Sequence, residues 1–316
     1  MLEAVDLSRA FGGRVALDGL SIQADAGEVI VLLGPNGAGK TTTVRLLNGV
    51  LLPDRGHSRV LGLDPTTEGH ELRRRTGVLT ENAGLDDRLT ARQNLAAAAA
   101  IRGMRGSEVD RRICESLERF GMGDRVDLPL QGASTGQRKR VALAGALLHE
   151  PEVLFLDEPT SGLDPNATRD VVDLIADLAR AQGRTVVLCT HLLPEAGRLA
   201  SKMAVLDRGR LRAFGRPAEL AAALWPGLAA DLDLGGPAMA PVLGLVRSCR
   251  GVLTVEVAHD GARVRVEGRE ALPAMVAALV SAGVPVYGAV PRPATLEDVY
   301  FALQGATPPI APGGTP

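Results

Sequence analysis

The sequence predicts an α/β domain built on a mostly parallel sheet, followed by a smaller α+β domain. The run Val29–Leu33 is continuously aliphatic and ends at a glycine, which is typical of a strand buried on both faces. After Pro151, short apolar runs alternate with longer stretches of helical periodicity, as in β–α–β units. Beyond residue 220 the expected elements follow the order β–α–β–β–α–β, the split βαβ pattern of ferredoxin-like domains.

The first 150 residues are expected to hold several strands and then an all-helical insert. Residues 2–34 are predicted to form strands, including Leu17–Ala24, and a helix is expected from Gly39 through Leu47. A short strand is expected at Gly77–Leu79. From about residue 85 to residue 150, Gly and Pro separate stretches of helical character, which predicts a helical subdomain. Its expected helices are Ala91–Met104, Glu108–Phe120 and Gly136–His149.

The alternation of strands and helices returns after Pro151 and closes the first domain near residue 220. Because the helices separate successive strands, the strands are expected to run parallel in one sheet. The expected elements are a strand at Val153–Leu156, a helix near Arg169–Ala181, a strand at Thr185–Cys189, a helix near Pro194–Leu199 and a strand at Met203–Asp207.

The second domain is expected to span residues 221–305. Two of its strands meet at Asp260-Gly261, and Asp-Gly between apolar stretches is a strong hairpin signal. Residues 306–316 are rich in Pro and Gly and are predicted to be disordered. The expected elements are the strands Ala230–Leu234, Val252–Ala258, Ala262–Glu267 and Val284–Ala289, and the helices Ala238–Ser248, Glu270–Ala282 and Thr295–Leu303.

The composition narrows the class of protein. A formal net charge of -2 gives no basic excess, so no nucleic-acid partner is expected. The three cysteines lie far apart without C-x-x-C spacing, which favours reduced thiols and a cytoplasmic compartment. The first residues lack a signal-peptide profile, and no uninterrupted apolar run reaches the roughly 20 residues of a membrane span. Any membrane association is therefore expected to come through a partner or a surface.

Residues 34–41 match the phosphate-binding pattern G-x-x-x-x-G-K-[ST], between a predicted strand and a predicted helix. Its glycines let successive backbone N–H groups turn toward one anion, and the helix N-terminus adds a favourable dipole. Lys40 is expected to reach the β- and γ-phosphates and Thr41 to bind Mg²⁺, so ATP with Mg²⁺ is the expected ligand. A plain Gly-rich turn is the alternative. The expected nucleotide-binding residues are Gly34, Pro35, Asn36, Gly37, Ala38, Gly39, Lys40, Thr41 and Thr42.

The apolar run Val153–Leu156 is followed directly by two carboxylates, Asp157 and Glu158. A carboxylate at the end of a strand beside a phosphate loop is suited to hold Mg²⁺ through its waters, and Asp157 has this place. Glu158 is then positioned to orient or deprotonate an attacking water. Taken alone the pair would be a solvated turn, but the phosphate loop favours a catalytic interpretation.

These motifs resemble the nucleotide-binding subunit of ABC transporters, over most of residues 1–220. The segment 133–137, Ala-Ser-Thr-Gly-Gln, precedes Asp157 by about 20 residues and is similar to the family signature Leu-Ser-Gly-Gly-Gln. Ser134, Gly136 and Gln137 are kept, whereas Ala133 and Thr135 replace the leucine and the first glycine. Alone this would be an ordinary helix cap; the resemblance implies that the three retained residues contact nucleotide.

Other landmarks of the family follow in order. The resemblance implies that Ser161-Gly162-Leu163-Asp164 is the loop that contacts a partner subunit, that His191 senses the γ-phosphate, and that Phe11 stacks on adenine. Without the family, His191 would be a surface residue and Phe11 a core residue. At the position where the family usually has a metal-contacting glutamine, this chain has Glu81, whose carboxylate offers an oxygen ligand but changes the local charge.

The resemblance also implies a mechanism and partners. Two cassettes dimerise head-to-tail, with ATP held between the phosphate loop of one and the signature of the other, so binding closes the dimer and hydrolysis reopens it. One cassette is present, so a homodimer is expected. Residues 294–305 and 79–85 resemble the corresponding segments of bacterial drug-exporter ATPase subunits of the daunorubicin type. This implies export through a separate membrane permease, with the chain peripheral to the cytoplasmic face of a bacterial membrane.

Two further interpretations are open. A non-transport ATPase of this class, acting on the ribosome or DNA, usually carries two cassettes, a coiled coil or a basic arm, and the sequence has no heptad run or basic tail. A ferredoxin-like fold would permit a ligand-sensing role for the second domain, but the sequence between residues 220 and 316 has no recognisable group of ligand-binding residues.

Overall fold

The structure is a computed structural model of the chain, and it describes residues 1–80 and 84–305. The chain divides into two compact units, Met1–Arg216 and Pro217–Pro316. The division falls close to the boundary expected from the sequence between residues 220 and 221. No helix in the described ranges combines the length and the apolar character needed to cross a membrane.

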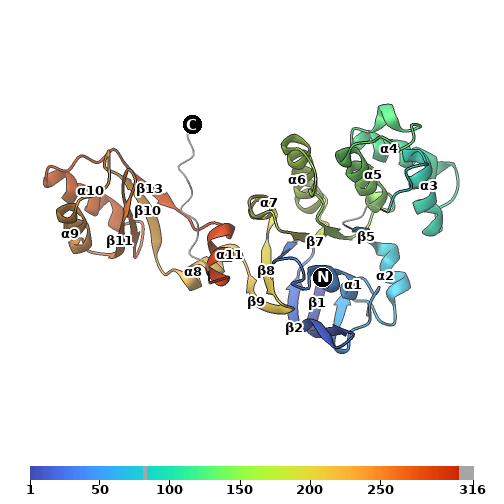
Figure 1. The fold of residues 1–316 in the computed structure, drawn as a ribbon, viewed down its shortest axis with the longest axis horizontal. Coiled ribbons are helices and arrows are strands. Elements are labelled where there is room, and N and C mark those ends of the chain that lie inside the picture. Colours follow the sequence, from blue (N-terminus) through green and yellow to red (C-terminus); the bar gives the residue numbers. More distant parts are fainter. Residues whose placement is uncertain (81–83, 306–316) are drawn as a thin grey trace. The chain divides into compact units, whose positions relative to one another are not determined.

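The first unit is built on a six-stranded sheet (Figure 1). Three of its four inner strands, β6, β7 and β3, consist entirely of buried residues, which explains their continuous apolar sequences. Neighbouring strands run parallel except at the last pair, which is antiparallel. In sheet order the strands are β5 (Thr76–Leu79), β6 (Val153–Asp157), β7 (Thr185–Thr190), β3 (Val29–Leu33), β8 (Lys202–Asp207) and β9 (Arg210–Gly215).

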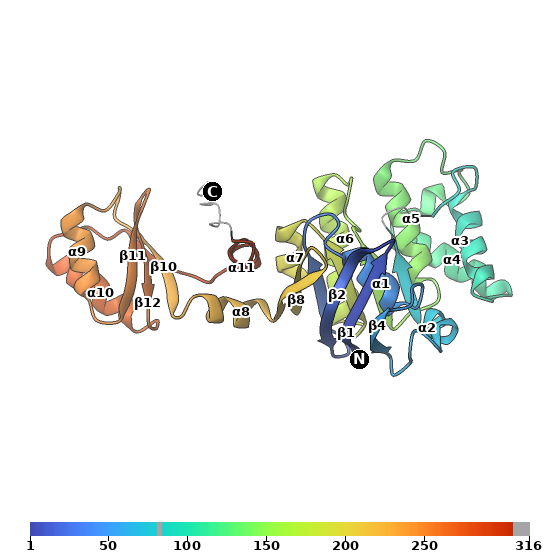
Figure 2. The ribbon, with the colours of Figure 1, turned by 60° about the horizontal axis from the view of Figure 1, so that its bottom comes forward.

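A second, three-stranded antiparallel sheet covers one side of the same unit. Its strands in order are β2 (Arg14–Ala24), β1 (Leu2–Phe11) and β4 (Arg55–Val60). The helix α1 (Lys40–Leu47) contacts strands of both sheets, and Figure 2 shows it between them. The other helices of the α/β part are α2 (Gly69–Arg75), α6 (Pro165–Arg180) and α7 (Leu193–Leu199).

The expected helical subdomain is present and contains α3 (Ala91–Ile101), α4 (Ser107–Arg119) and α5 (Thr135–Leu147), which pack on one another (Figures 1 and 2). A 3-10 turn, η1 (Gly123–Arg125), precedes α5. Both α3 and α5 begin at capping boxes, formed by Thr90 with Gln93 and by Ser134 with Gln137.

Some elements of the first unit differ from the sequence-based expectation. The helix α6 begins at Pro165 rather than near Arg169, because the Asp164 carboxylate accepts hydrogen bonds from the backbone N–H groups of Asn166 and Ala167, both at 3.0 Å. The elements β4, α2 and β9 were not expected. Each is short or lies at a sheet edge, where local patterning is weak.

The second unit contains a four-stranded antiparallel sheet and four helices within its described residues. The order of its elements from β10 to β13 is the predicted β–α–β–β–α–β. The bounds are α8 (Pro217–Leu224), β10 (Leu228–Asp233), α9 (Ala240–Ser248), β11 (Val252–Ala258), β12 (Gly261–Val266), α10 (Ala271–Ser281), β13 (Gly288–Arg292) and α11 (Leu296–Leu303), and the sheet order is β11-β12-β10-β13.

The last strand of this sheet begins and ends later than predicted. The expected strand Val284–Ala289 overlaps β13 (Gly288–Arg292) at Gly288 and Ala289. Pairing with β10 sets this register, since Gly288 lies opposite Asp233. The predicted tail 306–316 lies outside the described residues.

Candidate functional site

The loop between β3 and α1 has backbone positions that only glycine fits. Gly34 has φ 154°, and a Cβ there would lie 2.3 Å from the carbonyl oxygen of Leu206. Gly39 has φ 105°, and its Cβ would lie 2.8 Å from the carbonyl oxygen of Ala16. The chain therefore turns tightly against β8 and β2 before entering α1. These glycines let the loop pack closely on its own unit, and a glycine-rich loop ahead of a helix can turn successive backbone N–H groups toward one anion.

Lys40 is the first residue of α1 and is 7 % exposed. Its Nζ donates to the carbonyl oxygens of Gly34 at 2.6 Å and Pro35 at 3.3 Å. The ammonium thus lies along the loop, hydrogen-bonded to backbone acceptors that compensate its burial. A phosphate in the loop is a stronger acceptor for the same group, since both partners are then ionised.

Thr41, in the first turn of α1, contacts Asp157 at the carboxyl end of β6. The Thr41 hydroxyl donates to Asp157 Oδ2 at 2.7 Å, although 116 residues separate them in the chain. Asp157 ends β6 and lies beside Cys189 of β7, whose thiol pKa is raised well above its usual range by burial, so that the thiol is neutral. A hydroxyl and a carboxylate fit Mg²⁺, which takes one or two protein oxygens together with phosphate oxygens and water.

A dedicated all-protein metal cage is not needed for such an ion. In keeping with this, no group of three or more His, Cys, Asp or Glu side chains suited to a metal occurs among the described residues. Glu81, the third metal ligand expected from the sequence, lies outside the described residues.

Glu158 follows Asp157 and has an unusual backbone. Its φ of 51° lies in the left-handed region, which costs a non-glycine residue roughly 1–2 kcal/mol. The residue is 8 % exposed. The Nδ1 atom of His191 is 2.9 Å from Glu158 Oε2 but outside hydrogen-bonding geometry, so this buried oxygen has no hydrogen-bond partner in residues 1–80 and 84–305. A buried carboxylate oxygen without a partner is suited to accept a proton or a hydrogen bond from a bound water.

A cleft of about 690 Å³ joins these residues. Phe11 stands at its edge, 43 % exposed, with the Arg9 guanidinium 5.0 Å from the ring centroid. An exposed aromatic ring at the rim offers a flat surface for stacking. The residues that line the cleft are Phe11, Arg14, Val15, Ala16, Asn36, Gly37, Ala38, Gly39, Lys40, Thr41, Thr42, Asp157, Glu158, Ser161 and His191.

The cleft includes four residues that the sequence did not single out for nucleotide contact. Arg14, Val15 and Ala16 begin β2, and Ser161 follows the strand that carries the two carboxylates. Ser161 belongs to a segment identified only as a partner-contacting loop. Arg14 to Ala16 carry no motif, so only the packing of β2 against the phosphate loop reveals them.

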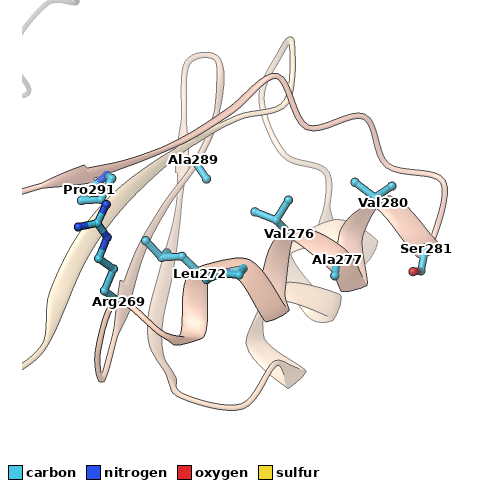
Figure 3. A pocket seen from close by; sticks show the side chains of 9 residues that line it. Arg269, Leu272, Val276, Ala277, Val280, Ser281, Ala289 and Pro291 are labelled. Carbon is cyan, nitrogen blue, oxygen red and sulfur yellow. The ribbon is translucent and has the colours of Figure 1, made fainter.

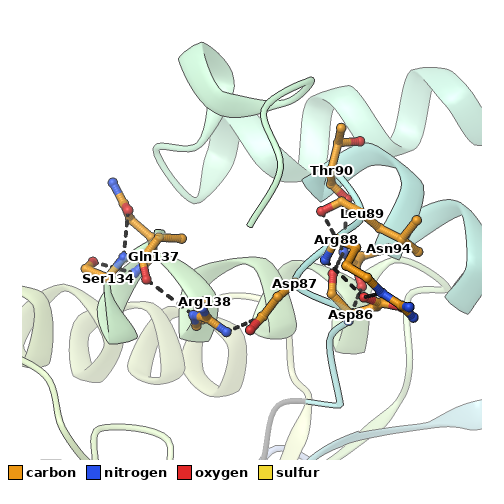
Figure 4. Close-up of polar contacts among 10 residues, drawn as sticks. Asp86, Asp87, Arg88, Leu89, Thr90, Asn94, Ser134, Gln137 and Arg138 are labelled. Atoms are coloured by element: carbon orange, nitrogen blue, oxygen red, sulfur yellow. Dashed lines mark hydrogen bonds and ion pairs between the residues drawn. The ribbon is translucent and has the colours of Figure 1, made fainter. Parts of the chain in front are cut away.

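The signature-like residues lie elsewhere. Ser134, Gly136 and Gln137 are not among the residues that line the cleft. Ser134 caps α5: its hydroxyl accepts from the Gln137 N–H at 3.2 Å, and its own N–H donates to Gln137 Oε1 at 3.0 Å (Figure 4). The same turn is tied to the segment before α3 by an ion pair between Arg138 and Asp87. One chain therefore has the loop and carboxylates in one place and the signature in another.

A second hollow lies in the other unit, between α10 and β13, with a volume of about 650 Å³ (Figure 3). Its lining is mainly aliphatic and proline, and includes Leu272, Val276 and Ala289. Arg269 and Ser281 are the polar residues of this lining. Its lining includes neither a glycine-rich loop nor a carboxylate pair.

The fold and the cleft together define a phosphate-loop nucleotide-binding cassette. Residues 17–161 match the family model described as ABC transporter. The chain is 41% identical over 223 residues to the daunorubicin/doxorubicin resistance ATP-binding protein DrrA of Streptomyces peucetius, covering 71% of this chain and 67% of that protein. It is 38% identical over 305 residues to the daunorubicin resistance ATP-binding protein DrrA3 of Streptomyces coeruleorubidus, covering 94% of this chain and 93% of that protein.

The chain thus belongs to the ATP-binding subunits of the ABC transporter family, and it is an ATPase. A third relative, the Nod factor export ATP-binding protein I of Ralstonia nicotianae, is 34% identical over 96% of this chain and 94% of that protein. The fold agrees: a solved ATP-binding subunit of an ABC transporter superposes with a TM-score of 0.65 at 30% identity, covering 71% of this chain and 93% of that one. A solved cassette described as dimeric and bound to ADP and Pi superposes with a TM-score of 0.63 at 24% identity. The match covers 68% of this chain and 98% of that one.

Proposed function

We propose that this chain is the ATP-hydrolysing subunit of an exporter, working as a homodimer on a separately encoded membrane permease. The observation that carries this proposal is the division of the site. The phosphate loop, Asp157, Glu158 and His191 line one cleft, whereas Ser134 caps a helix outside it. A second copy facing the first head-to-tail would bring its own Ser134 to the open side of this cleft, in a closed two-fold arrangement.

The roles of the residues follow from their chemistry. The backbone of Gly34 to Gly39 and the Lys40 ammonium would hold the phosphates, and Phe11 would stack on the base. Thr41 and Asp157 would hold Mg²⁺, which when bound neutralises charge on the phosphates. Glu158 would take the proton of the attacking water, and His191 would stand beside it. The positions Pro35, Asn36, Ala38 and Thr42 complete the loop, and Gly136 and Gln137 accompany Ser134 on the signature helix.

The direction and cargo of transport rest on the relatives. Their names refer to daunorubicin resistance and to Nod factor export, which supports export of a drug or another small hydrophobic cargo. A permease would hold the chain at the cytoplasmic face of a bacterial membrane. Nothing in the described residues or in the net charge of -2 favours action on the ribosome or DNA.

The proposal is tested by purifying the tagged chain from membranes of cells that also express a candidate permease. Co-purification with the permease, and ATP-dependent dimer formation by light scattering, are the expected results. Lys40→Ala is the matched control, since it should still join the permease but not dimerise with ATP. A chain recovered only as a monomer, without the permease and unaffected by ATP, would overturn the proposal.

A further inference from the structure

The chain contains three lysines, Lys40, Lys139 and Lys202, and Lys139 has no role in the motifs described above. It lies in the second turn of α5 and is only 5 % exposed. Its Nζ donates a hydrogen bond to the main-chain carbonyl oxygen of Glu158 at 2.9 Å. A buried ammonium is costly unless it is hydrogen-bonded, so this contact is a strong constraint on the position of both partners.

The acceptor of this bond belongs to a residue with a constrained backbone. Glu158 has φ 51°, its N–H donates to the carbonyl oxygen of Cys189 at 2.9 Å, and its carbonyl also accepts from the N–H of Ser161 at 3.3 Å. Cys189 of β7 therefore holds the N–H of Glu158, and Lys139 of α5 holds its carbonyl oxygen. Because side-chain direction follows from the main-chain conformation, the pair of contacts sets where the Glu158 carboxylate lies in the cleft.

The helix that carries Lys139 is the one that begins at Ser134. The two residues are separated by little more than one turn of a continuous helix, which moves as a rigid piece. A displacement of the signature turn would therefore reach the Glu158 main chain through the Lys139 side chain. Under the proposed function, Ser134 serves the nucleotide of the partner subunit, while Glu158 serves the nucleotide held by its own phosphate loop.

We propose that Lys139 is a positioning residue that holds Glu158 for proton abstraction and couples it to the signature helix of the same chain. This inference rests on the proposed function, because the coupling links two half-sites only in a dimer. Lys139 is not among the residues that line the cleft, and it reaches the site through its hydrogen bond to the Glu158 main chain. The competing reading is that Lys139 only anchors α5 to the sheet.

The test compares three variants of the full-length chain. Lys139→Met removes the donor but keeps the length of the stem, and Lys139→Arg keeps a charged donor. The matched control is Arg140→Gln on the next residue of α5, which loses an ion pair with Asp170 at 2.7 Å and a hydrogen bond to the Phe120 carbonyl oxygen at 3.2 Å but has no contact with Glu158 among the described residues. Lys139→Met is expected to lower kcat by about ten- to a hundredfold with the KM for ATP unchanged, the size of effect that a small misplacement of a catalytic group produces. Lys139→Arg should recover part of the loss, and Arg140→Gln should keep kcat near the wild-type value.

A double variant separates positioning from a general structural role. In the Glu158→Gln background the carboxylate base is gone, so Lys139→Met should add no further loss to the residual single-turnover rate, and ATP-dependent dimer formation should persist. An additive loss in that background, or a fall in ATP binding parallel to the fall in kcat, would show an anchoring role and overturn the inference. Wild-type kcat in Lys139→Met would overturn it as well. An inactive wild-type chain would instead contradict the proposed function.

Discussion

At the scale of single residues, Glu158 illustrates how position gives a common side chain a special task. Many glutamates in this chain are exposed and ion-paired, as Glu152 is with Arg75 at 2.6 Å. Glu158 instead has a left-handed backbone and a buried oxygen without a hydrogen-bond partner in the described part of the chain. A hydrogen bond from a bound water stabilises such an oxygen more than it stabilises a solvent-exposed one, because the buried oxygen has already lost its hydration before the water binds.

The substitution Glu158→Gln tests this role directly. Glutamine has nearly the same shape but accepts no proton, so ATP should still bind and close the dimer while turnover falls by roughly 10²–10⁴-fold. The expected product is an ATP-dependent dimer that persists, measured by light scattering beside a phosphate-release assay. Glu152→Gln is the control, because this glutamate is exposed and lies before the start of β6, at the other end of the strand from Asp157 and Glu158. Turnover of Glu158→Gln at the wild-type rate would show that another group takes the proton.

The identity of most candidate residues could be predicted from the sequence, but their geometry could not. The spacing from Gly34 to Thr41 and the carboxylates after Val153–Leu156 are local patterns, readable without tertiary structure. The 2.7 Å contact between Thr41 and Asp157 joins residues 116 positions apart. The contact of Lys139 with Glu158 likewise depends on how α5 packs on the sheet, and a lysine within a basic helical turn gives no sign of being buried.

At the scale of elements, the phosphate loop depends on two kinds of glycine. Gly34 combines φ 154° with a close approach to the carbonyl oxygen of Leu206. Gly37 has φ 79°, but a Cβ there would meet no described atom within 4 Å. The first glycine is therefore required for space and for conformation, and the second for conformation alone.

This difference predicts a ranking of two alanine variants. Gly37→Ala should lower the free energy of unfolding of the first unit by about 1–2 kcal/mol, the cost of a left-handed non-glycine residue. Gly34→Ala adds a steric clash with backbone, so its cost should reach at least about 3 kcal/mol. Urea unfolding followed by circular dichroism measures both, with Gly183→Ala, at φ 65° in a surface turn, as a third reference. Equal losses at positions 34 and 37 would contradict the steric argument.

The elements that the sequence missed share a physical cause. Strand β4 has the sequence Arg-Gly-His-Ser-Arg-Val and, among the described strands, pairs with β1, so its register is set by a partner about 50 residues away rather than by its own pattern. Helix α2 buries a single large apolar side chain, Leu72, and ends in three arginines. By contrast, β3, β6 and β7 are buried throughout, and their aliphatic runs are visible in any reading of the sequence.

At the scale of the whole molecule, the proposed homodimer requires each chain to supply two unlike halves of a site, because Ser134 does not line the cleft that holds the phosphate loop. A variant that lacks one half should be inactive by itself, and yet it should supply the other half to a partner. Lys40→Ala removes the ammonium from the loop but leaves α5 untouched. Gly136→Asp leaves the loop untouched and places a negative charge on the first turn of α5.

The second substitution should disturb the fold little. A Cβ at Gly136 would be 3.6 Å from the nearest Leu163 atom, which is an ordinary contact, and Gly136 lies in the first turn of α5, where an acidic residue suits the helix dipole. The added carboxylate would instead repel a phosphate presented by the partner subunit. Gly136→Asp is therefore expected to bind ATP as a monomer, to unfold near the wild-type temperature, and to have no ATPase activity.

The prediction for the assembly is that the two inactive variants restore activity when mixed. Neither variant is expected to dimerise with itself, so the dimers in an equal mixture pair one variant with the other, and each has one intact site and one doubly damaged site. The mixture should then reach up to about half of the wild-type rate if one intact site turns over alone. Each variant mixed with itself is the control, and phosphate release measured against the mixing ratio should peak at equal amounts. A mixture as inactive as its components would contradict two composite sites that turn over independently across a homodimer, since the intact loop of one chain and the intact signature of the other would have failed to meet.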